Sequence, residues 1–152
     1  MHTAIDIAMI DIQYVDDWRD SMAHQPSRNI KMPKPDNLWL QLVGFHEMGH
    51  IVLGYDYRTF LRDETRAEVW AYREIRRLGG RTSKMTRGLT HICLAAEYRR
   101  EGSSDKKHQK WLKRNTPELY AIWTGHNMHR EDTMIDKCYK HWLENHYQEA
   151  LR

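Results

Sequence analysis

The chain has 152 residues, of which 40% are hydrophobic and 11% aromatic, so its size and composition suit one domain with a buried core. The longest apolar run is broken by polar residues, and the N-terminus lacks a basic start followed by an apolar block. A membrane span and a secretory signal are therefore not expected, and the default location is the cytoplasm. Cys93 and Cys138 lie far apart and form no C-x-x-C pair, which argues against a zinc ribbon or a disulfide framework.

The net charge of +3 is unevenly distributed along the chain. Residues 76–114 contain twelve Lys or Arg against three acidic residues, so the remaining sequence is net acidic. The run KKHQKWLKR at residues 106–114 can follow a phosphate backbone while Trp111 stacks on a base. The alternative is a solvated helix face from which Trp111 and Leu112 point inward. Nucleic acid is thus a candidate partner of this region.

The first 36 residues contain no strong helix signal. Residues 4–15 fit a helix and a strand equally well, because their apolar residues match both periods. Residues 20–36 contain three prolines and several polar residues, which predicts a loop leading into the next element.

Residues 37–54 predict a buried helix that carries the motif HEMGH at positions 46–50. Asp36 or Asn37 can cap its start and Gly54 can end it, and apolar residues cover two adjacent faces. His46 and His50 lie one turn apart and share a face, which two imidazoles need in order to bind one metal ion. Their buried rings need partners, which a metal supplies at once, whereas the alternative is two core histidines bonded to backbone carbonyls.

A second helix is expected over residues 63–78, with Asp63 or a neighbour as cap and Gly79-Gly80 as the stop. Its inward stripe contains two carboxylates on a face that should be buried. We expect Glu64 to be the third metal ligand and Glu68, one turn later, to orient a ligand histidine. The alternative is that Glu64 favours the helix dipole and Glu68 pairs with an arginine. The remaining residues of that predicted stripe are Ala67, Ala71, Ile75 and Leu78.

The rest of the chain predicts further helices. One covers about residues 87–100 and ends at a Gly-Ser-Ser breaker, a shorter one covers 105–114, and Thr116-Pro117-Glu118 has the order of a helix start. The last is expected over 132–150, with an apolar stripe that can dock on a core.

HExxH followed by a helix bearing E-x-x-x-D/E resembles the gluzincin metallopeptidases, and the short intracellular ImmA/IrrE-like and related phage or plasmid metallopeptidases. The resemblance covers residues 38–79. It implies that His46, His50 and Glu64 bind Zn2+ and that Glu47 is the catalytic base. It also implies a zincin-like fold and a protein or peptide substrate.

Asp56 is a rival third ligand. Metzincin-type proteases place a ligand six residues after the second histidine, where Asp56 stands, although Gly54 falls one place later than their glycine. The string Gly54-Tyr55-Asp56 is also similar to that of YbeY-type RNA endonucleases, displaced by one residue. Candidate donors to a developing oxyanion are Tyr55, Tyr57, Tyr72 and His91.

These inferences together predict a mainly α (α+β) fold with a small or vestigial sheet, in a single domain over residues 1–152. Its parts are an N-terminal segment 1–36, the two site helices in 37–80 and a helical part 81–152. The expected function is zinc-dependent hydrolysis of a protein substrate, with water activated by the metal and Glu47 as general base. The alternative is a nucleic-acid-binding protein or metal-dependent nuclease that uses residues 76–114.

Overall fold

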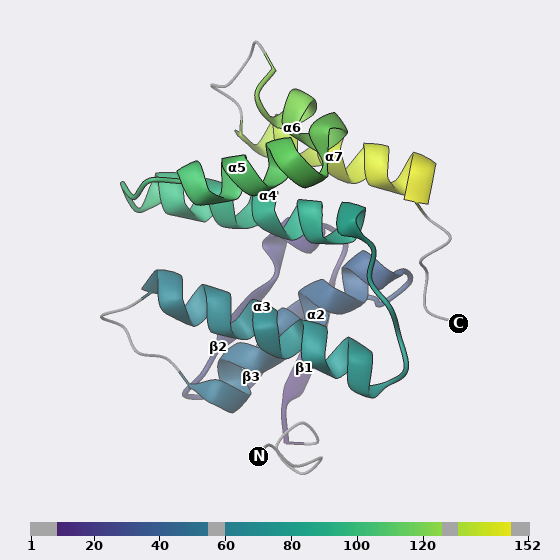
Figure 1. Cartoon of the computed structure of the whole chain (residues 1–152). Helices are drawn as coiled ribbons and strands as arrows, with labels where there is room; N and C mark the ends of the chain where they lie inside the picture. The colour runs from purple at the N-terminus through teal and green to yellow at the C-terminus, as the bar shows by residue number, and fades with distance from the viewer. Residues whose placement is uncertain (1–8, 55–59, 126–130, 147–152) are drawn as a thin grey trace. The chain divides into compact units, whose positions relative to one another are not determined.

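The computed structural model describes residues 9–54, 60–125 and 131–146, which form a mainly α fold with a small sheet (Figure 1). Within these ranges lie six α-helices and three strands, as the mainly α (α+β) prediction requires. The described residues separate into two compact units, one ending at Arg81 and the other beginning at Thr82. That division falls one residue after the boundary expected at 80/81. The single-domain expectation stays a prediction.

The first unit begins with a three-stranded sheet whose central strand is β3 (Asn29–Pro33). Strand β1 (Asp11–Val15) pairs with β3 in parallel, and β2 (Met22–His24) pairs with it in antiparallel. A short 3-10 helix, η1 (Trp18–Asp20), separates β1 from β2. Residues 11–15 therefore adopt the extended alternative of the two that their sequence allowed.

The loop predicted for residues 20–36 is wrong, because β2 and β3 lie within it. In β3, Ile30 and Met32 are buried while Asn29 and Lys31 are exposed, which is the alternation of a strand with one covered face. The pattern spans only five residues and ends at Pro33, whose ring nitrogen cannot donate to a neighbouring strand. Because this alternation is short and lies beside three prolines, the sequence resembles that of a turn or loop.

Helix α2 (Leu38–Leu53) carries the HEMGH motif and confirms the predicted helix. The Asn37 side chain accepts a hydrogen bond from the Leu40 amide at 2.8 Å, which caps the first turn. At the other end Gly54 has a φ of 76°, a conformation that favours glycine, and its amide donates to the His50 carbonyl. The helix packs against β2 and β3 and against α3.

Helix α3 (Phe60–Arg77) begins three residues before the predicted start. Asp63 is therefore not its cap but lies in its first turn, buried, with Arg66 at 3.8 Å. Leu78 was expected to face inward, yet it is 54% exposed, because the helix ends one residue before it. The other small and apolar positions of that stripe, Ala67, Ala71 and Ile75, are buried as predicted.

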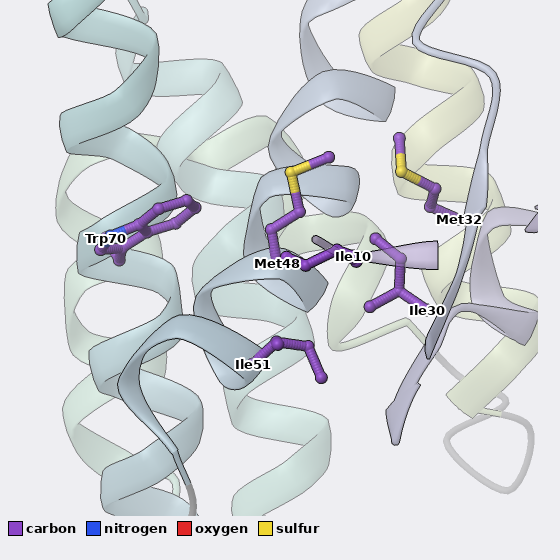
Figure 2. Close-up of a cluster of buried hydrophobic side chains, with 6 residues drawn as sticks. All are labelled: Ile10, Ile30, Met32, Met48, Ile51 and Trp70. Carbon is purple, nitrogen blue, oxygen red and sulfur yellow. The ribbon is translucent and has the colours of Figure 1, made fainter. Parts of the chain in front are cut away.

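The core of the first unit lies on both sides of α2. Figure 2 shows Met48 and Ile51 of α2 between Trp70 of α3 and the sheet residues Ile30 and Met32. Burial of such side chains stabilises a fold by roughly 1.5–3 kcal/mol each. The sheet and α3 thus contact α2, the helix that carries the HEMGH residues, from two directions.

The second unit consists of four helices. They are α4 (Lys84–Arg100), α5 (Lys106–Asn115), α6 (Pro117–Trp123) and α7 (Glu131–His146), close to the ranges predicted for them. Ser83 caps α4 by accepting a hydrogen bond from the Thr86 amide at 3.2 Å. Trp142 of α7 is fully buried and donates to the Thr86 hydroxyl at 3.0 Å, which ties the last helix to the first.

The two cysteines are free thiols, with Cys138 buried and Cys93 partly buried. Burial raises the pKa of the Cys138 thiol to about 12, so this sulfur stays protonated near neutral pH.

In the described ranges, we find no helix with the length and apolar content needed to cross a bilayer.

Candidate metal centre

Two adjacent helices bring the predicted ligand residues together. His46 and His50 project from α2 one turn apart, with their ring planes nearly perpendicular at 87° and the centroids 4.6 Å apart. Glu64 and Glu68 project from α3, also one turn apart. Within the described part of the chain, His46, His50 and Glu64 are the one group of three potential ligands close enough to share a metal ion.

The three side chains approach one another to hydrogen-bonding distances. The Nε2 atom of His46 lies 2.9 Å from one carboxylate oxygen of Glu64, and Nε2 of His50 lies 3.0 Å from the other. The two Nε2 atoms are themselves 3.0 Å apart. All three side chains therefore point at one another rather than at separate partners.

These distances are slightly shorter than those between ligands that share a zinc ion. Tetrahedral zinc bonds of about 2.0–2.1 Å separate neighbouring ligand atoms by about 3.3–3.4 Å, so the donor atoms would need to move apart by a few tenths of an ångström. Without a metal, each Nε2 must carry a proton to reach Glu64, and the two N–H groups then crowd each other. His46, His50 and Glu64 could instead each direct a lone pair at a divalent cation, which would remove that conflict.

Glu68 contacts the far side of the first histidine. One of its carboxylate oxygens lies 2.5 Å from Nδ1 of His46, while Nε2 of the same ring faces Glu64. A carboxylate on the second nitrogen fixes the tautomer and orientation of a metal-binding imidazole and increases its basicity. Glu68 thus lies next to the ring that it was expected to orient, and the orienting role stays a prediction.

The site is largely buried but not closed. The His46, Glu64 and Glu68 side chains are 12%, 15% and 17% exposed, whereas that of His50 is 4% exposed. One edge of the cluster is therefore accessible to solvent. A catalytic zinc site needs such an edge, because one coordination position must remain open for water or substrate.

The electrostatics of the cluster favour charged groups. Burial alone would lower the pKa of His46, but the charge of Glu68 and the hydrogen bonds to both glutamates raise it well above its usual value. Burial would likewise raise the pKa of Glu64, yet its bonds to His46 and His50 hold it well below the ordinary range. Two carboxylates thus supply the negative charge that a divalent cation requires.

Glu47 lies between the two histidines in sequence and is 9% exposed. Its burial raises the pKa of its carboxyl, although the neighbouring imidazoles act in the opposite direction. A carboxylate with a raised pKa is a better proton acceptor for catalysis than an exposed one.

The other candidate residues are not all brought to this place. Asp56, Tyr55 and Tyr57 lie outside the described residues, so the choice between Glu64 and Asp56 rests on the geometry of Glu64 alone. Tyr72 is on α3, two turns after Glu64. His91 belongs to the second unit, where it contacts His108.

Sequence reasoning did not single out Gly49, which matters for this geometry. A Cβ atom at Gly49 would lie 3.2 Å from Cε3 of Trp70 and 3.3 Å from the Cα and carbonyl oxygen of Ala67. The absence of a side chain at Gly49 lets α2 approach α3 closely enough for the ligands to meet. The sequence indicates this contact only through a glycine in one helix and alanines at helical spacing in the next.

Comparison with known proteins gives no match: no protein-family model, curated protein or solved structure corresponds to this chain. The functional interpretation therefore depends on the geometry and chemistry of the site.

Proposed function

We propose that this protein is a zinc-dependent hydrolase that cleaves a protein or peptide substrate. The observation that carries the proposal is the convergence of His46, His50 and Glu64 at mutual distances of 2.9–3.0 Å. Two imidazoles and one carboxylate are the ligand set of catalytic zinc in several metallopeptidases.

Each residue of the site has a separate task in this proposal. A zinc ion held there would polarise the scissile carbonyl and make water acidic enough to lose a proton near neutral pH. Glu47 accepts that proton and passes it to the leaving amine. Glu68 orients His46 through its Nδ1 atom, so that Nε2 stays directed at the centre of the site.

The first test separates metal binding from catalysis. We expect purified protein to contain about one zinc per chain by elemental analysis. In Glu47→Gln the zinc content should be retained, while cleavage of an unfolded protein or a mixed peptide library should fall by at least about a hundredfold. In His46→Ala zinc content and cleavage should both be lost.

Glu101→Gln is the matched control, because Glu101 is exposed and lies outside the first unit. It should change neither zinc content nor cleavage. A folded protein that binds no zinc at micromolar concentrations would refute the proposal.

The same preparations separate the peptidase from a metal-dependent nuclease. Cleavage of an oligonucleotide in place of peptide, abolished by Glu47→Gln, would assign the activated water to a phosphodiester. We favour the peptide bond because the residues that resemble metallopeptidases include the whole ligand set.

A further inference from the structure

Helix α5 carries cations on one face and no acidic residue along its length. At 100° per residue its four lysines and one arginine fall within about 120° of the helix circumference, and all five are exposed. His108 and Leu112 lie on the opposite side and are buried. We call these five cations and Arg87 of α4 the basic surface; its α5 members are Lys106, Lys107, Lys110, Lys113 and Arg114.

The members of the basic surface have no carboxylate partner within 4.0 Å among the described residues. Three of the acidic residues near these helices already contact other side chains, and Glu118 pairs with His141 at 2.9 Å. Asp105 accepts from Arg99 at 2.6 Å, and Glu97 accepts from Arg100 at 2.6 Å. The positive charge of the basic surface is therefore not neutralised within this unit.

His91 and Trp111 join the two helices beneath this charge. The His91 ring stacks on Trp111 with centroids 4.1 Å apart, and its Nδ1 lies 2.9 Å from Nδ1 of His108. Arg87 of α4 and Lys107 of α5 both act on the charge of His91, so the two helices present their cations around the same point. The contacts among these rings hold together the parts of α4 and α5 that carry the cations.

We propose that the basic surface binds the phosphate backbone of a nucleic acid duplex without reading its sequence. Cations one turn apart on α5 are separated by about 5–6 Å along the helix axis, which lets several contact successive phosphates. We expect no base to stack on the face of Trp111 that His91 covers. The inference does not depend on the zinc site, which lies in the other unit.

A nucleic acid fits this surface better than a membrane does. Helices that bind in a lipid interface bury an exposed apolar face beside their cations. On α5 the apolar residue Leu112 is 0% exposed and faces the unit's own core. The arc of α5 that carries the five cations contains no apolar residue, and the partly buried Trp111 beside it is stacked on His91.

The test measures binding of the full chain to a short labelled duplex of mixed sequence by fluorescence anisotropy over a range of salt concentrations. At about −0.9 per phosphate contact, six contacts predict a slope of log affinity against log salt of about −5. A single strand of the same sequence should bind more weakly and with a shallower slope. Lys110→Gln/Lys113→Gln should reduce the slope by about 2 and the affinity near 0.1 M salt by at least about tenfold.

Lys137→Gln/Lys140→Gln on α7 is the matched control, since it removes the same charge from two exposed lysines with the same spacing in the same unit. It should change the affinity by less than about threefold, because distant exposed charges are screened. Both pairs are exposed, so thermal melts should confirm that the variants stay folded.

Three results would overturn the inference. They are absent or salt-insensitive duplex binding, an equal loss of affinity in the two double variants, and tighter binding to the single strand than to the duplex. Capture by anionic phosphatidylserine vesicles in the absence of duplex binding would assign the surface to a membrane instead.

Discussion

At the scale of single residues, two histidine clusters in the described part of the chain have opposite electrostatics. His46 lies beside two carboxylates, and their charges raise its pKa well above the usual value despite its burial. His91 is half buried beside another imidazole and two cations, and its pKa is lowered to about 4. Burial contributes most to that shift, followed by the charges of His108, Lys107 and Arg87. The first environment attracts a cation, whereas the second excludes one.

The pKa of His91 predicts that the second unit loses stability in acid. An unfolded histidine binds a proton as pH falls below about 6.5, but folded His91 does so only near 4. The contribution of His91 to the free energy of unfolding is therefore complete above about pH 6.5 and decreases as the pH falls toward 4. Between pH 7.5 and 4.5, we expect the melting temperature of the wild type to fall by on the order of 5 °C more than that of His91→Gln.

Tryptophan fluorescence melts can measure this difference, since Trp111 stacks on His91. His141→Gln serves as control because it removes a more exposed imidazole, paired with Glu118 at 2.9 Å on the surface of the same unit. The same acid sensitivity in wild type and His91→Gln would show that the buried pair is not responsible.

At the scale of elements, the site depends on how closely α2 and α3 pack. Gly49 of α2 meets Ala67 of α3, whose backbone atoms would lie 3.3 Å from an added Cβ. Backbone atoms cannot rotate aside as a flexible side chain can. Small residues at this contact therefore set the separation of the two helices, and with it the distance from each histidine to Glu64.

Gly49→Ala should weaken the first unit and its metal site together. Alanine favours a helix over glycine by about 1 kcal/mol, but overpacking a tight contact costs about 1–3 kcal/mol. We expect a net loss of about 1 kcal/mol in the free energy of unfolding and a zinc affinity lowered by about tenfold or more. Denaturant unfolding and competition with a zinc chelator measure the two effects.

Thr65→Ala on the exposed side of α3 is the comparison variant, and zinc affinity should be unchanged in it. If Gly49→Ala bound zinc as tightly as the wild type, the close contact of the helices would not control the geometry of the site.

At the scale of the whole molecule, the candidate metal centre and the basic surface belong to different compact units. The ligands come from α2 and α3, which are held by the sheet and the core around Met48 and Ile51. The basic surface comes from α4 and α5, whose packing includes His91 and Trp111. The proposed hydrolysis and the proposed duplex binding can therefore be removed separately by mutation.

Zinc should accordingly stabilise the first unit selectively. Free zinc at about a hundred times its dissociation constant stabilises the folded state by about 2.7 kcal/mol. Removing it with a chelator should increase amide hydrogen exchange in α2 and α3 and leave α4–α7 unchanged. Equal changes in both units would contradict the assignment of the metal to the first one.

Much of this arrangement follows from local sequence patterns. The caps Asn37 and Gly54 and the apolar faces between them marked α2, and Gly79-Gly80 marked the end of α3. The two carboxylates of α3 were recognisable because they share the face of Ala67 and Ala71, which burial requires to be inward. Such signals span one or two helical turns and act without help from the rest of the chain.

The small sheet could not be predicted in the same way. Strands β2 and β3 have three and five residues, and the sequence around them contains prolines that favour a loop. Their extended form is stabilised by pairing with each other and with β1, and by the cover that α2 gives to Ile30 and Met32. These are contacts between segments that the local pattern does not contain.

The sequence by itself determined the helices and the residue types of the candidate site, because helix periodicity, caps and the HEMGH spacing are local properties. Only the tertiary structure decided that Glu64 meets both histidines while Glu68 reaches the far nitrogen of His46. Those distances depend on the close approach of α2 and α3 at Gly49, on α3's earlier start at Phe60 and on a core shared with the sheet. Packing between distant segments fixes such separations to fractions of an ångström, and spacing along one chain segment does not.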